Sequence, residues 1–256
     1  MLPFQSTGDG PPVLLVMGLG LPGDAWWRTV PVLARECRVI TFDNRGSGRA
    51  EPVAGPLTIA GMAADAVAVL DAAGVARAHV YGVSMGGMIA QELALRHPER
   101  VGSLVLGATS AGGAAATPPD AATLAFLARR AAMPEEEGRW ASVPYVYSER
   151  TRHEGGARIG QDFARRRGYA FQPAGYRAQL AAAATHDAAA RLGEIDAPTL
   201  VVHGVEDRMI PPANGRALAA AIRGARLLEV ADAAHLYTTD EPAADEAVLE
   251  FLAGGA

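Results

Sequence analysis

The stretch Gly82-Val83-Ser84-Met85-Gly86-Gly87 decides the fold, because it places a serine between a strand-like run (78–83) and an apolar, helix-like run (88–97). A Gly-x-Ser-x-Gly at such a turn is the pattern of a nucleophile elbow, in which the serine takes strained backbone angles and the glycines leave room for it. A chance Gly/Ser loop is the alternative, and the strand-to-helix context disfavours it. The pattern predicts Ser84 as a nucleophile and the Met85 N–H as a donor to a developing oxyanion.

The composition is ordinary for a soluble globular protein of 256 residues, with half of the residues hydrophobic and a fifth charged. A formal net charge of −5 provides no basic field for nucleic acid or an anionic membrane. The lone Cys37 cannot form an internal disulfide, and no signal peptide or membrane-length apolar run is visible. We therefore expect a cytoplasmic protein that acts on a small molecule, with no nucleic-acid or membrane partner; whether it forms a homodimer stays open.

Around the elbow, predicted strands alternate with predicted helices. The apolar runs at 13–17, 39–42, 78–83 and 101–106 are typical of strands buried on both faces of a parallel sheet. Between the second and third of these, Thr58 resembles an N-cap and Gly74 a helix end. This order predicts an α/β fold, a mostly parallel central sheet flanked by helices and joined by right-handed crossovers.

The alternation stops after residue 108 and resumes near residue 199. Between these points an Ala/Gly/Pro-rich linker (111–119) precedes segments that favour helix, at 121–132, 158–167 and 173–185. Strands are then predicted at 199–203 and 225–230, and helices at 212–222 and 242–252. The sequence thus predicts a sheet-containing core in residues 1–109 and 192–256, with a helical cap or lid inserted at 110–191.

A serine hydroxyl needs a base to accept its proton and an acid to orient that base. Asp207 follows the predicted strand 199–203, and His235 follows the predicted strand 225–230. Both lie beyond the carboxyl ends of strands, at the same sheet edge as Ser84, where ligands bind in open α/β sheets. We predict His235 as the base and Asp207 as the acid. The neighbouring Glu206 is the main competitor for the acid, and a surface or helix-capping role is the alternative for His235.

With these features the chain resembles the α/β-hydrolase superfamily, and within it the small-lidded serine esterases and lactonases of the 3-oxoadipate enol-lactonase type, with cofactor-free perhydrolases nearby. The resemblance covers Pro12 to nearly the C-terminus and rests on the elbow, on Asp43-Asn44-Arg45-Gly46-Ser47-Gly48, on Pro198 to Gly204 with Asp207, and on His235. It implies the Ser84–His235–Asp207 triad and no cofactor. It also implies that the backbone N–H of Leu19 joins that of Met85 in an oxyanion hole.

The chain departs from this family in several places. Met17-Gly18 stands where His-Gly is usual, Ala234 replaces a glycine before the histidine, and Ala50 replaces a serine. Only eleven residues precede Pro12, where the family usually has a β-hairpin. We therefore expect one strand near Phe4, a shortened N-terminal sheet edge, and six or seven strands in all, with the lid after the sixth family strand.

Aromatic residues concentrate in the insertion, where some form a local core and others are expected to cover an apolar pocket over Ser84. The side chains predicted to line this pocket are Trp26, Trp140, Tyr145 and Tyr237.

Other signals are given structural roles. Gly18-Leu19-Gly20 with Gly23 lacks the third glycine of a dinucleotide-binding loop. The run 165–167 of three arginines is interpreted as a solvated helix face rather than an anion site, and 43–45 as a loop that ties down adjacent turns. No metal site is predicted, because the histidines lack ligand spacing, and two of them are expected to be core residues in strands, His79 and His203.

The expected function is hydrolysis of a carboxylic ester or lactone through an acyl-enzyme on Ser84. A thioesterase, amidase or perhydrolase would use the same triad. A biosynthetic cyclase or lyase, or a non-enzymatic ligand receptor, could reuse the pocket without acyl transfer. An epoxide hydrolase or dehalogenase is disfavoured, because those enzymes need an aspartate where Ser84 stands.

Overall fold

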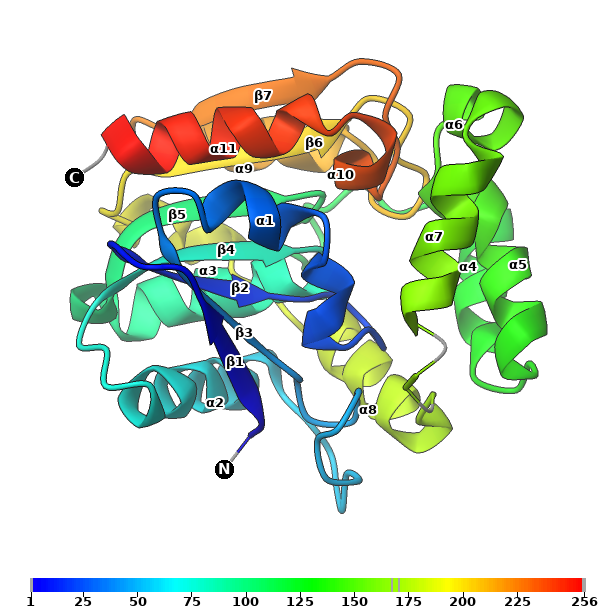
Figure 1. The fold of residues 1–256 in the computed structure, drawn as a ribbon, viewed down its shortest axis with the longest axis horizontal. Coiled ribbons are helices and arrows are strands. Elements are labelled where there is room, and N and C mark those ends of the chain that lie inside the picture. The colour runs from blue at the N-terminus through cyan, green and yellow to red at the C-terminus, as the bar shows by residue number, and fades with distance from the viewer. Residues whose placement is uncertain (1, 167, 170, 255–256) are drawn as a thin grey trace.

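A seven-stranded sheet runs through the centre of the structure, a computed structural model that describes residues 2–166, 168–169 and 171–254 (Figure 1). The strand order is β1-β3-β2-β4-β5-β6-β7; β1 pairs antiparallel with β3, and the remaining neighbours pair in parallel. The strands are β1 (Phe4–Thr7), β2 (Pro12–Val16), β3 (Arg38–Phe42), β4 (Ala78–Val83), β5 (Val101–Gly107), β6 (Thr199–Gly204) and β7 (Arg226–Val230). The predicted mostly parallel α/β sheet is confirmed, as are the strand near Phe4 and the short N-terminal edge.

Helices cover both faces of the sheet, so the central strands are buried on both sides. One face packs against α2 (Ile59–Ala72), α3 (Met85–Arg96) and α9 (Ala213–Ala221), and the other against α1 (Thr29–Leu33) and α11 (Ala243–Gly254) (Figure 1). Alternate residues of β2 serve the two faces: Leu14 and Val16 point to the first, Val13 and Leu15 to the second. The short elements are η1 (Gly23–Trp26), η2 (Pro98–Arg100) and α10 (Tyr237–Asp240).

The ends of α2 agree with the signals in the sequence. The Thr58 hydroxyl accepts a hydrogen bond from the Gly61 N–H at 3.0 Å, and Gly74 after the helix has a φ of +69°. The cap therefore supplies a partner for a backbone donor that the first helical turn leaves unpaired.

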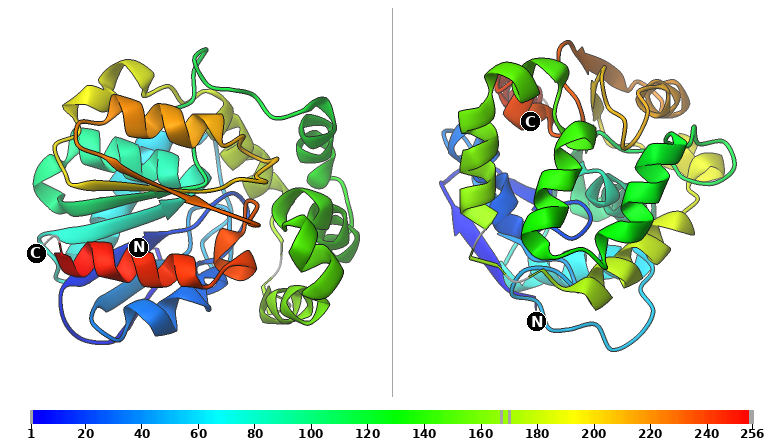
Figure 2. Two further views of the ribbon diagram at one scale, coloured as in Figure 1. Left: turned by 90° about the horizontal axis from the view of Figure 1, so that it is seen from above. Right: turned by 90° about the vertical axis from the view of Figure 1, so that its right-hand side faces the viewer.

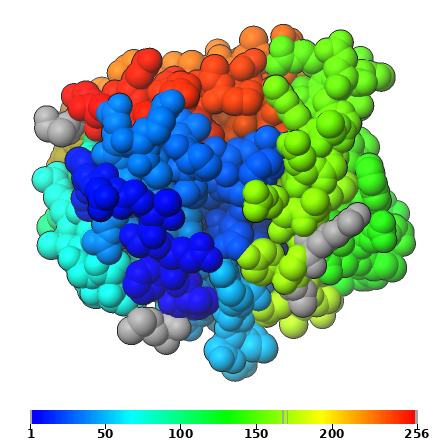
Figure 3. Space-filling view, in the orientation of Figure 1, coloured from blue at the N-terminus to red at the C-terminus, as the bar shows by residue number. Residues whose placement is uncertain are grey.

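Between β5 and β6 the chain forms a group of helices at the end of the sheet where the parallel strands terminate (Figure 2). This group comprises α4 (Ala121–Arg130), α5 (Glu135–Val146), α6 (Glu149–Glu154), α7 (Gly156–Arg166) and α8 (Pro173–Ala184), with η3 (Ala189–Glu194) before β6. We call residues 110–191 the cap; these boundaries remain a prediction. In the space-filling view the cap lies directly against the N-terminal part of the core (Figure 3).

The sequence predicts α4, α7 and α8 but not α5 or α6. Helix α5 begins with three glutamates and contains Pro144, so it lacks a regular apolar stripe. Helix α6 is a six-residue polar segment, and the Ser148 side chain caps it by accepting from the Thr151 N–H. The predicted end of α7 at Arg167 lies outside the described residues. Among the described residues, no helix has the length and apolar character required to cross a bilayer.

Candidate active site

Ser84 occupies a strained turn between β4 and α3, with φ 59° and ψ −125°. A non-glycine residue in such a conformation costs on the order of 1–3 kcal/mol and persists only when its surroundings hold it there. Four hydrogen bonds do so. The Ser84 N–H donates to the Gly107 carbonyl at 2.9 Å, and the Ser84 carbonyl accepts from the Gly87 N–H at 2.9 Å, the Met88 N–H at 3.3 Å and the Thr109 hydroxyl at 2.7 Å. This is the geometry predicted for the elbow.

The elbow glycines are required by close backbone packing. A Cβ at Gly82 would lie 2.2 Å from the Gly86 carbonyl oxygen, and a Cβ at Gly86 would lie 2.0 Å from the Val16 carbonyl oxygen. Strands β2 and β4 and helix α3 therefore approach each other backbone to backbone at this point, which only glycine permits.

Asp207 and His235 meet beyond the ends of β6 and β7. The Nδ1 of His235 lies 2.8 Å from Oδ2 of Asp207, and Oδ1 of Asp207 accepts from the N–H groups of Met209 at 2.8 Å and Ile210 at 2.9 Å. Burial raises the pKa of Asp207, but the neighbouring histidines and their hydrogen bonds outweigh it, so the net pKa is lowered. An ionised carboxylate here places the proton of His235 on Nδ1 and leaves Nε2 able to accept one.

His203 is a second contact of Asp207 that the sequence interpretation treats only as a core residue. Its Nε2 lies 2.8 Å from the Ile210 carbonyl oxygen and 3.4 Å from Oδ2 of Asp207. Because a carbonyl only accepts, Nε2 carries the proton and also faces the carboxylate. His203 thus helps to hold Asp207 ionised and in place. The signal for it is the spacing: His203 is the last residue but one of β6 and lies four residues before Asp207.

Ser84, His235, Met85 and Leu19 line one cavity of about 530 Å³ between the core and the cap. Gly18, next to Leu19, packs against the elbow: a Cβ there would lie 3.0 Å from Cβ of Ser84. The structure therefore brings the predicted nucleophile, base and oxyanion donors to the same space, with Asp207 buried behind His235.

The loop that carries Leu19 is fixed without the usual histidine. The Asn44 side-chain amide donates to the Met17 carbonyl at 2.8 Å, and Oδ1 of Asp43 accepts from the Gly23 N–H at 2.7 Å. From the cap, Oε1 of Gln179 accepts from the Gly20 N–H at 2.7 Å. The interpretation of 43–45 as a loop that ties down its neighbours agrees with these bonds.

The four aromatic side chains predicted to line the pocket do not line this cavity, so that prediction is wrong. Trp26 and Tyr237 are buried in the core, where both border a small hollow of about 20 Å³. The Tyr237 hydroxyl lies 2.6 Å from the hydroxyl of Tyr81. Trp140 is 57% exposed. Tyr145 stacks behind the wall, with its ring centroid 4.8 Å from that of Phe126.

The aromatic residues that line the cavity are instead Phe126, Tyr169, Phe171 and Tyr176. The concentration of aromatics in the insertion indicates an apolar wall, but which side chains face inward depends on how the cap helices pack. The run of arginines at 165–167 is also only partly a solvated face, because Arg166 lines the cavity. Arg167 lies outside the described residues.

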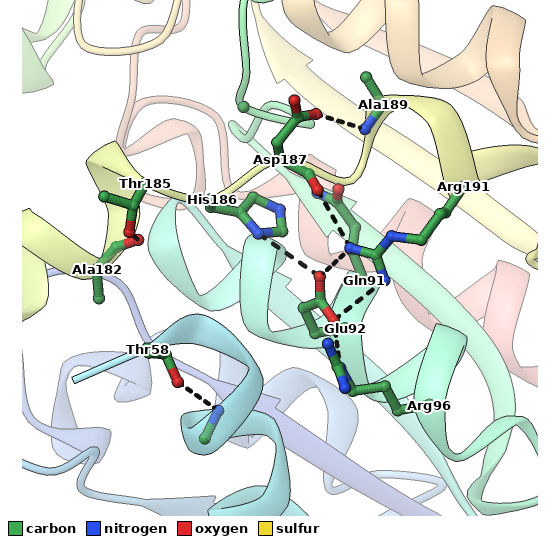
Figure 4. Close-up of polar contacts among 12 residues, drawn as sticks. Thr58, Gln91, Glu92, Arg96, Ala182, Thr185, His186, Asp187, Ala189 and Arg191 are labelled. Carbon is green, nitrogen blue, oxygen red and sulfur yellow. Dashed lines mark hydrogen bonds and ion pairs between the residues drawn. The ribbon is translucent and has the colours of Figure 1, made fainter.

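A buried carboxylate ties the elbow helix to the end of the cap (Figure 4). Glu92 of α3 accepts from Nε of Arg96 at 2.6 Å and pairs through both carboxylate oxygens with Arg191 of η3. His186, whose Nδ1 lies 3.8 Å from Oε1 of Glu92, lines the cavity. Burial raises the pKa of Glu92, but the bonds from the two arginines outweigh it and the net pKa is lowered. Glu92 therefore stays ionised and keeps α3 connected to η3.

A second buried carboxylate, Asp162 of α7, joins the cap to the opposite side of the core. Its Oδ1 accepts from Nε1 of Trp27 at 3.2 Å, and its Oδ2 accepts from the hydroxyls of Tyr147 at 3.0 Å and Thr239 at 2.8 Å. Arg28 completes the set with an ion pair at 3.1 Å. Asp162 therefore holds α7 beside the segment that follows His235.

No group of three or more His, Cys, Asp or Glu side chains that could hold a metal ion occurs within residues 2–166, 168–169 and 171–254.

Comparison with known proteins agrees with this geometry. A family model described as the alpha/beta hydrolase fold matches residues 11–242. A protein of Mycobacterium tuberculosis H37Rv named as a non-heme bromoperoxidase, BpoC, is 34% identical over 98% of this chain and 97% of its own length. Its crystal structure aligns with a TM-score of 0.87 over 100% of this chain and 97% of that one.

Two further relatives carry hydrolytic names. A protein of Azorhizobium caulinodans named as a carbamate hydrolase, RutD, is 33% identical over 93% of this chain and 89% of its own length. The structure of an enol-lactonase from Burkholderia xenovorans LB400 aligns with a TM-score of 0.87 at 28% identity, covering 98% of this chain and 96% of that one. With the family model spanning most of the sequence and the elbow on a parallel sheet, the chain belongs to the α/β-hydrolase family.

Proposed function

We propose that this α/β-hydrolase is a serine hydrolase that cleaves a carboxylic ester or lactone through an acyl-enzyme on Ser84. The observation that carries the proposal is that strained Ser84 and His235, which Asp207 contacts from behind, line one cavity with mainly apolar walls. A serine and a histidine paired with a carboxylate, facing the same cavity, are the groups that acyl transfer requires. An apolar cavity strengthens the electrostatic interactions inside it.

In the first half of the reaction, Oγ of Ser84 attacks the carbonyl carbon while Nε2 of His235 takes the hydroxyl proton. The charge on Asp207 stabilises the imidazolium that forms. The N–H groups of Met85 and Leu19 donate to the oxyanion of the tetrahedral intermediate, and one such donor contributes about 10²–10³ in turnover. As the carbon–oxygen bond of the ester breaks, His235 returns its proton to the leaving oxygen.

In the second half, His235 takes a proton from water, which attacks the acyl carbon and releases the acid and the free serine. For a lactone the leaving oxygen stays attached to the acyl group, so a single ring-opened hydroxy acid is released. The names of the enol-lactonase and the carbamate hydrolase support this class of reaction, since both describe attack on a carbonyl bearing a heteroatom leaving group.

A second candidate follows from the likeness to the bromoperoxidase. If hydrogen peroxide takes the place of water, the same acyl-enzyme releases a peroxy acid, which can oxidise bromide. Bromination that depends on both acetate and Ser84 would indicate this perhydrolase activity.

The test is turnover of 4-nitrophenyl acetate, 4-nitrophenyl butyrate and small γ-lactones by the wild type and by Ser84→Ala. We expect the variant to lose about 10⁴ or more in kcat, since the nucleophile itself is removed. Ser6→Ala, at an exposed serine on β1, is the control and should retain full activity. Equal turnover by Ser84→Ala and the wild type would refute the proposal and favour a lyase or cyclase that uses the cavity differently.

A further inference from the structure

Helix α8 of the cap reaches the core loops that follow β2 and β3 (Figure 1). Its Gln179 is completely buried, and both ends of the side-chain amide are used. Oε1 accepts from the Gly20 N–H at 2.7 Å, and Nε2 donates to the Arg45 carbonyl oxygen at 2.7 Å. Because an N–H group only donates and a carbonyl only accepts, these partners fix which way the amide is turned. Gln179 is therefore a short bridge from the cap to two core loops.

The packing of α8 brings the glutamine to both loops. Gly175 lies four residues before Gln179, on the same face of the helix, and a Cβ there would be 2.2 Å from the Gly46 carbonyl oxygen. Tyr176 packs against Gly20, where a Cβ would lie 2.9 Å from Cδ2 of the ring. The helix thus contacts both loops one turn before the glutamine side chain bonds to them.

Gly20 belongs to the turn that carries Leu19, whose N–H is the second oxyanion donor of the proposed mechanism. The turn is closed by a long hydrogen bond, 3.4 Å from the Leu21 N–H to the Gly18 carbonyl oxygen. Gly20, at the third position, has a φ of +70°, as in a type II turn. A type I turn differs mainly by a rotation of the central peptide, between Leu19 and Gly20. The bond from the Gly20 N–H to Gln179 fixes the orientation of that peptide.

The other end of this loop is held from the core. The side-chain amide of Asn44 donates to the Met17 carbonyl at 2.8 Å, and Arg45, which accepts from Gln179, follows Asn44 directly. With the bond from Gly20 to Gln179, these contacts tie the two loops together at both ends. Glycine gives a loop backbone freedom, so the direction of an N–H group within it depends on such anchors. The core supplies one anchor and the cap supplies the other.

We propose that Gln179 is a positioning residue for the reaction: from the cap, it holds the turn so that the Leu19 N–H points at the oxyanion. This inference rests on the proposed hydrolase function. An oxyanion donor acts only when it lies about 2.7–3.1 Å from the charged oxygen. Gln179 itself is absent from the cavity lining, so it does not contact the substrate. Its bonds therefore contribute to binding of the transition state and not of the ester.

The experiment compares two glutamines that both join the cap to the core. Gln179→Met keeps the length of the side chain but can make neither of its hydrogen bonds. Gln172→Met is the matched control, because Nε2 of Gln172 donates to the carbonyl oxygens of Gly48 at 3.2 Å and Ala50 at 3.1 Å. Both of these bonds reach the loop after β3 and not the turn that carries Leu19. Both variants should melt at a lower temperature than the wild type, so kinetics must separate them.

With 4-nitrophenyl butyrate, Gln179→Met should lower kcat by about 10- to 100-fold, the cost of a misplaced donor, and change KM by less than about threefold. Gln172→Met should keep kcat within about twofold of the wild-type value. The loss in kcat without a loss in KM is the signature of an interaction made only in the transition state.

A butyl trifluoromethyl ketone tests the oxyanion hole directly. Oγ of Ser84 adds to its carbonyl carbon, His235 takes the hydroxyl proton, and the carbonyl oxygen becomes an oxyanion that nothing leaves behind to break down. The inhibition constant should rise in Gln179→Met by about the factor by which kcat/KM falls, and it should stay unchanged in Gln172→Met.

Gln179→Glu keeps the proposal testable if the methionine variant does not fold. A protonated carboxyl can accept from Gly20 and donate to Arg45, whereas a carboxylate cannot donate and places a negative charge near the oxyanion. The ratio of wild-type to variant kcat should therefore grow as the pH rises from 6 to 8, a comparison in which the titration of His235 cancels. A ratio of one across this range overturns the proposal.

The remaining outcomes separate the two hypotheses. Wild-type kcat in Gln179→Met, an equal loss of kcat in Gln179→Met and Gln172→Met, or a loss confined to KM overturns the positioning role and leaves the proposed function standing. If the wild type turns over no ester, the proposed function fails, and the role of Gln179 fails with it.

Discussion

The two walls of the cavity are built in different ways. On the core side, Ser84 is held by four hydrogen bonds that each involve its own backbone, and Asp207 is held by two backbone N–H groups. On the cap side, the wall consists of side chains on helices, among them Phe126, Phe171 and Arg130. Backbone hydrogen bonds fix positions to within tenths of an ångström, as reaction geometry requires. Side chains on a cap can change without moving the groups held by the core. In the proposed hydrolase, the core therefore holds the reacting groups and the cap supplies side chains that contact the substrate.

The largest expected effect comes from a substitution on the core side of the cavity. Asp207→Asn should lower kcat by about 10⁴ with little change in KM, because a neutral amide neither stabilises the imidazolium nor selects the correct tautomer of His235. Glu206→Gln is the control, since Glu206 accepts from the Glu149 N–H at 2.7 Å rather than from His235. Steady-state kinetics on one ester checks both variants. An equal loss in the two would mean that the acid has been misassigned.

The next effect compares a glycine of the core with a glycine of the cap. Gly86→Ala should reduce the free energy of unfolding by about 3 kcal/mol or more, since the added Cβ meets the Val16 carbonyl oxygen. Gly160→Ala on α7 should raise it by up to about 0.5–1 kcal/mol, because a Cβ there meets nothing within 4 Å and alanine favours a helix. Urea denaturation measures both. If both variants are destabilised alike, the described difference in packing between core and cap is incorrect.

A smaller effect is expected at Glu92, which connects the core to the end of the cap. Glu92→Gln should cost about 2 kcal/mol of unfolding free energy near neutral pH, since Arg96 and Arg191 lose a buried partner but remain partly exposed to water. The pKa of Glu92 is lower when folded, so its contribution is complete above the unfolded value of about 4.3 and is lost as the pH falls through the folded value. Urea curves of wild type and variant should therefore converge below about pH 4. A difference that stays constant with pH would contradict the ion-pair explanation.

The smallest effect concerns a buried acid on the core side. Oδ2 of Asp245 on α11 accepts from the Thr29 hydroxyl at 2.9 Å, and burial raises the pKa of this acid to about 7. A raised carboxyl pKa means that the folded state holds a proton that the unfolded state has released. Stability therefore falls as the pH rises from about 4 to about 7. Asp245→Asn should remove this slope and be more stable than wild type at pH 8, by on the order of 1 kcal/mol. The measurement is the melting temperature of both proteins between pH 5 and pH 8. A difference in melting temperature that does not change with pH would contradict the raised pKa of Asp245.

The sequence predicts the core far better than the cap, for a physical reason. Strands such as 13–17 and the elbow around Ser84 are specified by local patterns, either continuous apolar runs or glycines that a tight turn demands. Asp207 and His235 follow strand ends, and parallel topology brings strand ends together. These constraints are visible along the chain, so the residues that meet at the site can be named in advance.

The cap lacks such constraints. Helix α5 has no regular apolar stripe, and the inward direction of Phe126 rather than Trp140 depends on how neighbouring helices pack. The same applies to Arg166, which belongs to a run of arginines typical of a solvated face but lines the cavity. His203 is a similar case in the core, because its contact with Asp207 depends on the turn after β6. Tertiary packing decides each of these positions.

The most direct test of the central claim is covalent labelling with a fluorophosphonate, followed by intact-mass and peptide mass spectrometry. We predict a single adduct on the peptide containing Ser84, formed much more slowly in His235→Ala and absent in Ser84→Ala. No adduct in the folded wild type, an adduct on a different serine, or labelling that persists in Ser84→Ala would contradict the assignment of Ser84 as the nucleophile.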